Sequence, residues 1–498
     1  MPDRHRHPRP RPPRLAAALA LIASAPLAAQ TRSAPPAPPA SAWSARLGRE
    51  LARVVSQGDS AALERFLAAR LAPSALGDRP LAAHRELWRT IHRQSGGELA
   101  VRGVRPLGHG TLQVLWAGRI DRGIEIFLEP DPADSLRIRW LAVLGPVSPA
   151  AEIRLPDSVP GGEGELLAVV ERELERLAAA GEFSGVVGMA RRGKVLFLRG
   201  VGWANREAGI PVGPHTRFHL ASLGKSLTAV AIGQLVERGQ LRLDDSVASL
   251  LPEHDWHPEA RGITVRHLLE HTSGLGQADS APAGIVAAVA RAGPAFAPGT
   301  RWAYSNDGYE MLGAIIEKVS GEPYAEYVAR HVLAPAGMRD TDFFPADTAL
   351  PNRAIGYARR ETDYFGREPR EPNTPRLRGK RGTAAGGAYA TVPDLLRFAD
   401  ALHRGALLRR ATLDTLTTPG WPLPGPIPGE RYGYGFSVRA VGGTRGFGNG
   451  GGGANWGICS SLITLADGSA TVAVLSNGDP PVCMQLAHRL AGLLARLP

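Results

Sequence analysis

Strand-like segments lie at both ends of the region from residue 163 to 498, and a helix-rich stretch separates them. At its start, residues 186–191 and 195–200 flank an Arg-Gly pair and predict a hairpin. Near its end, residues 461–465 and 471–476 predict two further strands. A chain with this pattern must assemble one sheet from distant segments and insert a helical lobe between them.

The sequence divides into two folded regions joined by a segment rich in proline and glycine. A chain of 498 residues exceeds the size of one compact core, and 44% hydrophobic residues suffice for two. Residues 146–162 have the composition of a linker. We therefore expect a smaller domain over residues 43–145 and a larger one over residues 163–498.

The smaller domain, residues 43–145, begins with apolar residues at helical spacing, which predict three helices, and four strand-like runs follow. This order predicts an α+β unit that resembles the cone-shaped fold shared by ketosteroid isomerase and nuclear transport factor 2. No acid pair or set of aromatic hydroxyls in it demands catalysis. We interpret it as an accessory or interaction domain whose partner is unknown.

The first 29 residues have a basic start, an apolar run and small residues at the end, which is the pattern of a signal peptide. Residues 30–42 are rich in Pro, Ala and Ser and predict a disordered spacer. No later stretch approaches eighteen apolar residues, so we expect no transmembrane anchor. The sequence thus predicts export to the periplasm or the medium.

The net charge of +11 does not indicate nucleic-acid binding. Five arginines against Asp3 place part of it in residues 1–29, and the remainder forms no basic helix or aromatic-flanked stripe. We expect a small-molecule or peptide substrate and no nucleic-acid partner.

Cys459 and Cys483 are the only cysteines of the sequence. In an exported protein the pair favours a disulfide, because an oxidising compartment lacks the reducing pool of the cytosol. Two buried free thiols are the alternative.

Ser222 and Lys225 stand three residues apart at the start of a long apolar helix. One helical turn brings the hydroxyl and the amine to the same face, and a buried, neutral amine can accept the serine proton. Lysine occurs at only four positions in this arginine-rich chain, and arginine cannot act as a base in a protein. A capping serine beside a surface lysine would produce the same spacing.

Two further segments support a site. Tyr304 and Asn306 precede a predicted helix, where a tyrosine can share proton transfer and an amide can orient a substrate carbonyl. Residues 446–453 are glycine-rich and precede a strand, so a substrate can approach the backbone of Asn449, Gly450, Gly451 and Gly452, whose N–H groups can stabilise an oxyanion.

Three rival motifs predict other chemistry. His267 to His271 match a His-x-x-Glu-His zinc signature, but Thr-Ser-Gly ends that helix at once. Gly224-Lys225-Ser226 copies the end of a phosphate loop without its first glycine, and the glycines at 448, 450 and 453 precede a strand where a dinucleotide fingerprint needs a helix. We expect neither a metal nor a cofactor.

Three segments together resemble the class C β-lactamase and penicillin-binding-protein-like serine hydrolases: residues 218–226 (Phe-His-Leu-Ala-Ser-Leu-Gly-Lys-Ser), 263–275 (Ile-Thr-Val-Arg-His-Leu-Leu-Glu-His-Thr-Ser-Gly-Leu) and 386–391 (Gly-Gly-Ala-Tyr-Ala-Thr). The resemblance implies a β-lactamase/transpeptidase-like α+β or α/β fold, with an antiparallel sheet flanked by helices plus a helical lobe.

The resemblance also implies roles for the site residues. Ser222 would be the acylated nucleophile, Lys225 and Tyr304 would share proton transfer, and Asn306 would bind the substrate. The oxyanion hole would use the backbone N–H groups of Ser222 and Gly452. Asn449 stands where the family usually has Lys or His, which weakens the anchoring of a substrate carboxylate.

The sequence therefore predicts an exported serine hydrolase that forms an acyl-enzyme on Ser222 and acts on esters, D-amino-acid peptides or related amides. A β-lactamase or D,D-carboxypeptidase proper is an alternative. A non-catalytic ligand-binding protein of the same fold is an alternative of another class.

Overall fold

The computed structural model describes residues 42–497, apart from residues 79, 98, 109–110, 118–122, 132–133, 135–136, 148–149, 277–281, 346–347, 349, 361–369, 378–380, 424–426 and 428. The predicted signal peptide and nearly all of the predicted spacer lie outside the described residues. Within the described part of the chain, every helix is too short or too polar to cross a membrane.

The N-terminal region has four helices followed by four strands. The helices are α1 (Ala42–Gln57), α2 (Ser60–Arg70), α3 (Pro73–Asp78) and α4 (Leu81–Ser95). The strands are β1 (Ala100–Gly108), β2 (Thr111–Ala117), β3 (Gly123–Pro130) and β4 (Ile138–Val147), and they form one antiparallel sheet in chain order. The short helix α3 is additional to the three predicted helices. The likeness to the cone-shaped fold stays a prediction.

A capping aspartate and two buried tryptophans explain where helix α2 begins and how the helices pack on the sheet. Asp59 caps α2, because its carboxylate accepts hydrogen bonds from the N–H groups of Ala61 and Ala62 and so separates α2 from α1. Trp88 on α4 and Trp116 on β2 are fully buried, with ring centroids 5.5 Å apart. These two rings join helices and sheet in one core.

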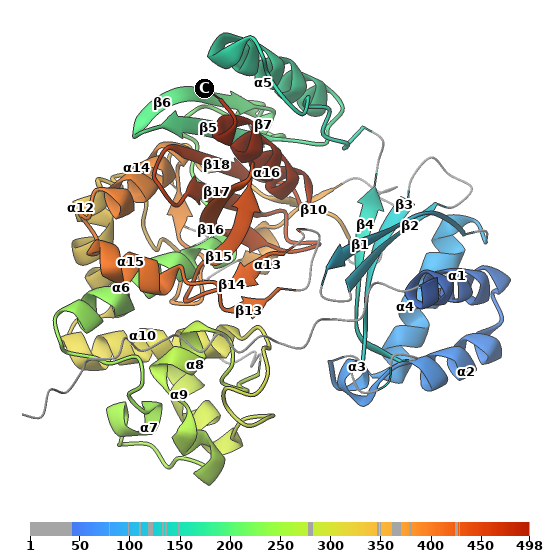
Figure 1. Ribbon diagram of the computed structural model, residues 1–498, viewed down its shortest axis with the longest axis horizontal. Helices are drawn as coiled ribbons and strands as arrows, with labels where there is room; N and C mark the ends of the chain where they lie inside the picture. The colour runs from blue at the N-terminus through green and yellow to red at the C-terminus, as the bar shows by residue number, and fades with distance from the viewer. Residues whose placement is uncertain are drawn as a thin grey trace, which may run out of the picture. The chain divides into compact units, whose positions relative to one another are not determined.

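An eight-stranded antiparallel sheet forms the centre of the larger region (Figure 1). Its order is β13-β14-β15-β16-β17-β18-β5-β6. The strands are β5 (Gly185–Arg191), β6 (Lys194–Val201), β13 (Trp421–Pro422), β14 (Arg431–Tyr432), β15 (Ser437–Val441), β16 (Thr444–Gly452), β17 (Cys459–Leu465) and β18 (Ala470–Ser476). Because β18 pairs with β5, the prediction of a sheet built from both ends of this region is confirmed.

The two faces of the sheet pack in separate cores. Along β5, Val186 and Ala190 join one core, and Val187 and Met189 join the other, as the alternation of a strand requires. The second core includes residues of helices α5 (Gly162–Ala179) and α16 (Val482–Ala495). A sheet covered on both faces explains the continuous apolar composition of its central strands.

The middle of the chain forms the helical lobe, which is coloured green to yellow in Figure 1. The residues after the lobe lead back to the sheet. The helices of this middle part are α6 (Lys225–Glu237), α7 (Val247–Leu250), α8 (Val265–Leu269), α9 (Pro282–Ala292), α10 (Asn306–Ser320), α11 (Tyr324–Val328) and α12 (Ala334–Ala336). Helices α13 (Thr374–Leu377), α14 (Val392–His403) and α15 (Arg410–Leu416) follow.

Short turns and strands complete these elements. They are the 3-10 turns η1 (Ala221–Gly224) and η2 (Pro258–Gly262), the π-helical turn η3 (Ala329–Leu333), and strands β7 (Trp203–Asn205), β8 (Ile210–Pro211), β9 (Phe218–His219), β10 (Tyr357–Ala358), β11 (Glu371–Pro372) and β12 (Tyr389–Ala390).

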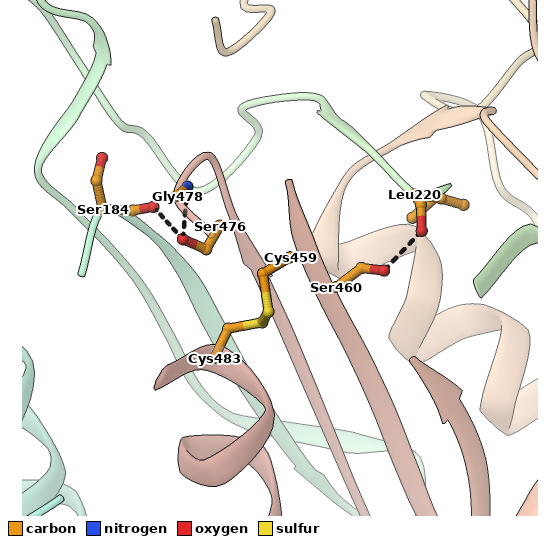
Figure 2. The surroundings of a disulfide bond; sticks show 7 residues. All are labelled: Ser184, Leu220, Cys459, Ser460, Ser476, Gly478 and Cys483. Atoms are coloured by element: carbon orange, nitrogen blue, oxygen red, sulfur yellow. Dashed lines mark hydrogen bonds between the residues drawn. A yellow bond between two sulfur atoms is a disulfide. The ribbon is translucent and has the colours of Figure 1, made fainter. Parts of the chain in front are cut away.

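The predicted disulfide joins Cys459 at the start of β17 to Cys483 on α16, with 6.2 Å between the Cα atoms. Both cysteines are buried, and Figure 2 shows the bond between them. The next residue, Ser460, donates a 2.6 Å hydrogen bond to the carbonyl of Leu220, two residues before Ser222. The disulfide therefore braces the strand that supports the segment leading to Ser222.

Candidate active site

Ser222 lies in the 3-10 turn η1, which leads directly into α6. The residue before it, Ala221, has a left-handed φ of 46°, a conformation that an alanine adopts only where its surroundings hold it. Its N–H donates to Nδ1 of His219 at 3.1 Å, and its carbonyl accepts from the N–H of Gly387 at 3.1 Å. Only glycine fits at Gly386, because a Cβ there would lie 2.2 Å from the Ala221 carbonyl oxygen.

Lys225 is the first residue of α6, and its side chain is fully buried. Its Nζ lies 2.6 Å from the carbonyl oxygen of Ala385, 2.7 Å from Oδ1 of Asn306 and 3.3 Å from Oγ of Ser222. Burial lowers the pKa of Lys225 to about 7, although the negative charge of Glu310 acts in the opposite direction. A substantial fraction of the amine is therefore neutral near neutral pH.

Tyr304 lies on the other side of the serine, and its hydroxyl donates a 2.6 Å hydrogen bond to Oγ of Ser222. Burial raises the pKa of Tyr304 to about 12, against the smaller lowering effect of that hydrogen bond, so the phenol keeps its proton. Helix α10 begins two residues later, where Ser305 caps it by accepting from the N–H of Gly308 at 2.9 Å. This cap presents Asn306 at the helix start, with its side chain toward Lys225.

The structure therefore brings together the four residues Ser222, Lys225, Tyr304 and Asn306, which we call the proton-transfer cluster. They arrive from two segments about eighty residues apart. The roles that the resemblance assigns to them stay predictions.

Residues 449–452 at the end of β16, which we call the glycine strand, lie beside the nucleophile turn. A Cβ on Gly451 would lie 2.3 Å from the carbonyl oxygen of Leu220 and 2.7 Å from the backbone nitrogen of Ser222, so only glycine permits this approach. Gly452 is exposed and has a φ of 119°. Its predicted role with Ser222 in an oxyanion hole is compatible with this close approach.

Asn449 is only 8% exposed, and its side chain is bonded to the protein. Nδ2 donates to the carbonyl of Gly435 at 3.0 Å and to Oγ of Ser226 at 3.2 Å, and Oδ1 accepts from the N–H of Gly450 at 2.8 Å. The amide thus links β16 to α6 and to the turn before β15. Substrate binding by Asn449, Gly450 and Gly451 stays a prediction.

The rival zinc motif has other contacts. Nδ1 of His267 accepts from the N–H of Thr264 in a capping box that starts α8, and Nδ1 of His271 accepts from the N–H of Ser305. Within the described ranges, no group of three or more His, Cys, Asp or Glu side chains could hold a metal ion.

The sequence did not reveal two partners of the cluster. One is the Ala385 carbonyl, because a main-chain acceptor has no residue signature. The other is Glu310, whose carboxylate accepts from the Thr383 hydroxyl and from the N–H of Ala385. Its position one helical turn after Asn306 on α10 is the signal that could have identified it.

Fold and site together define a chain of the β-lactamase/transpeptidase fold in which a buried lysine lies next to a partly exposed serine. The sequence model of the family described as Beta-lactamase matches residues 170–496, well over half of the chain. The chain belongs to the beta-lactamase family, whose members are serine hydrolases.

Three similar proteins illustrate the range of this family. The putative penicillin-binding protein PbpX of Bacillus subtilis is 33% identical over 261 residues, which cover 51% of this chain and 62% of the relative. Esterase EstB of Burkholderia gladioli is 39% identical over 185 residues, covering 32% and 46%. The crystal structure of a penicillin-binding protein from Bacillus halodurans has a TM-score of 0.55 and 28% identity, covering 63% and 98%. The chain thus spans 62% or less of these two curated relatives' length.

Proposed function

We propose that this chain is an exported serine hydrolase that forms an acyl-enzyme on Ser222. The observation that carries the proposal is the set of contacts around Lys225. In the neutral amine, two hydrogens serve the Ala385 carbonyl and Oδ1 of Asn306, which leaves the lone pair for the hydroxyl of Ser222. A buried amine arranged in this way is the base that a serine nucleophile requires.

The reaction follows from the protonation states. The Ser222 proton moves to Nζ of Lys225 while Oγ bonds to the substrate carbonyl carbon, and the N–H groups of Ser222 and Gly452 receive the oxyanion. When the carbonyl re-forms, the bond to the leaving group breaks, and the leaving oxygen or nitrogen accepts a proton from the Tyr304 hydroxyl. The protonated amine of Lys225 then returns a proton to the Tyr304 oxygen. Water attacks the acyl-enzyme by the same route and releases the acid.

Uncharged esters and small D-amino-acid peptides are the substrates we propose, ahead of β-lactams. Asn449 is neutral and bonded inward, so it offers no charge to a substrate carboxylate. Asn306 is exposed, which suits an amide that orients a substrate carbonyl. The identity to Esterase EstB supports the ester part of this proposal.

A fluorophosphonate probe, followed by intact-mass measurement, tests the nucleophile. We expect one adduct on the wild-type protein, none on Ser222→Ala, and normal labelling of Ser249→Ala, at an exposed serine of α7. Absence of an adduct on the wild type would instead favour the ligand-binding alternative. A panel of 4-nitrophenyl esters and D-amino-acid amides would then rank the substrates.

Export is part of the same proposal, and the buried disulfide between Cys459 and Cys483 supports it, because such bonds persist in oxidising compartments. Expression of the full chain in a Gram-negative host, with fractionation and N-terminal sequencing, tests it. We expect mature protein in the periplasm that begins near residue 30. Full-length protein confined to the cytosol would contradict export.

A further inference from the structure

One residue, His271, holds the backbone on both sides of Tyr304. The N–H of Ala303 donates to the His271 carbonyl at 2.9 Å, and the N–H of Ser305 donates to Nδ1 of its ring at 3.1 Å. The imidazole also lies against the phenol ring, with 4.5 Å between the centroids and 36° between the planes. His271 therefore fixes the position of Tyr304 through main chain and ring together.

The contact with Ser305 requires one form of the imidazole. Nδ1 accepts a hydrogen bond, so the ring must be neutral with its proton on Nε2. Burial and the nearby charge of Lys225 both hold the pKa of His271 well below its ordinary value. The rings of Tyr304, Tyr309, Tyr432 and Trp302 surround the imidazole with centroids 4.5 to 6.0 Å away, and Nε2 has no hydrogen-bond partner among the described residues.

The turn that carries His271 also supports the segment that leads to Tyr304. The N–H of Gly299 donates to the Thr272 carbonyl, and the N–H of Ala295 donates to the Gly274 carbonyl, both at 2.8 Å. Gly274 has a φ of 77°, and a Cβ there would lie 2.5 Å from the carbonyl oxygen of Phe296. The His-Thr-Ser-Gly turn, residues 271–274, thus supports residues 295–305 through hydrogen bonds to their backbone N–H groups.

We propose that His271 is a positioning residue for Tyr304, which keeps the tyrosine hydroxyl on Oγ of Ser222, and that this is the role of the motif that resembles a zinc signature. The inference rests on the proposed function, because it gives His271 a purpose only if Tyr304 takes part in acyl transfer. A shift of about 1 Å in a reacting group can cost on the order of 100-fold in rate.

Two substitutions of His271 distinguish its hydrogen bond to the Ser305 N–H from its ring contact with Tyr304. His271→Phe keeps an aromatic ring but removes the acceptor for the Ser305 N–H. His271→Asn keeps an acceptor oxygen near the place of Nδ1, and asparagine tolerates the left-handed φ of 60° at this position. We expect kcat for a 4-nitrophenyl ester to fall about 100-fold in His271→Phe with little change in KM. In His271→Asn, kcat should stay closer to wild type than to Tyr304→Phe.

The decisive readout is a double-mutant cycle with Tyr304→Phe. If His271 acts through Tyr304, His271→Phe should have no further effect on kcat once the hydroxyl is gone. Equal losses in both backgrounds would show general damage to the fold and would overturn the inference. A His271→Asn protein that folds but is as slow as Tyr304→Phe would also overturn the inference. This second test applies even if His271→Phe does not fold.

The failure of the proposed function looks different. In that case the wild-type protein would carry no fluorophosphonate adduct on Ser222, whatever residue stands at 271. Labelled wild type combined with full activity of His271→Phe would defeat the positioning role alone. Stoichiometric zinc in the purified wild-type protein, lost in His271→Phe, would also overturn it in favour of a metal site.

Discussion

The proton-transfer cluster and the glycine strand face the same nucleophile but differ in their electrostatics. In the cluster, the buried Lys225 and the half-buried Tyr304 are titratable and hydrogen-bonded to Ser222. In the glycine strand, Asn449 is neutral and turned into the protein, and the rest is backbone. Under the proposed function, the groups that transfer protons are therefore side chains of the cluster, while the glycine strand offers backbone N–H groups and no side-chain charge to a substrate.

Replacement of Lys225 by Met should have the largest effect. The thioether matches the length of the buried side chain but cannot accept the Ser222 proton, so kcat/KM for an ester should fall by about 100- to 10,000-fold. Stopped-flow or steady-state hydrolysis measures this loss. Lys194→Met, at an exposed lysine, is the control that should keep wild-type rates. A Lys225→Met rate within about threefold of wild type would remove lysine from the mechanism.

Gly451→Ala tests whether the glycine strand contributes through its backbone alone. The new Cβ would press on the Leu220 carbonyl and the Ser222 nitrogen, so the strand must move away and carry the Gly452 N–H with it. Loss of one oxyanion donor costs on the order of 100-fold in kcat. In Gly453→Ala the Cβ meets Trp456 only at an ordinary 3.4 Å, so kcat should hardly change. Similar rates for the two variants would exclude this strand from the oxyanion hole.

Asn449→Lys should introduce a positive charge into the glycine strand. We expect the ratio of kcat/KM for 4-nitrophenyl succinate to that for 4-nitrophenyl acetate to rise about tenfold, because a charge-assisted hydrogen bond contributes roughly 1.5 kcal/mol. Asn449→Ala is the control, since it removes the amide without adding charge. An equal rise in both variants would mean that the side chain only restricts access and does not set charge preference.

Local patterns sufficed to predict the parts of the site that one segment determines. Lys225 begins α6 three residues after Ser222 in the turn η1, and Asn306 begins α10 two residues after Tyr304, so each pair is close in sequence. The places of β5 and β18 at the two ends of the region predicted one shared sheet, although not that these two strands pair with each other. The two-residue strands β13 and β14 at the sheet edge are too short to show an alternation of apolar and polar residues, so the sequence did not predict them.

The remainder of the site depends on contacts between distant segments. Whether Asn449 faces the substrate or the core is decided by the Gly435 carbonyl and the Ser226 hydroxyl, neither of which its own segment specifies. The Ala385 carbonyl reaches Lys225 across 160 residues of sequence. The fold determines which main-chain groups become partners, and because every residue has a carbonyl, the residue type does not predict them.

Glu310→Gln should have the smallest effect, on the pH dependence of the proton-transfer cluster. The carboxylate charge raises the pKa of Lys225 against the larger effect of burial, so its removal should lower that pKa further. Activity requires the neutral amine and rises with pH through the pKa of Lys225, about 7 in the wild type. The acid limb of the kcat/KM profile, which reports the pKa values of the free enzyme, should therefore move to lower pH with the plateau unchanged.

The shift is small because the charge of Glu310 is the smaller of the two effects on the pKa of Lys225, and burial is the larger. Glutamine keeps an oxygen that can accept from Thr383, so the segment that presents the Ala385 carbonyl stays in place. Glu253→Gln, at a surface acid paired with Lys318, controls for a change in net charge. A movement of the acid limb to higher pH would mean that Glu310 does not act on Lys225 as a negative charge, and the electrostatic account of the cluster would then rest on burial alone.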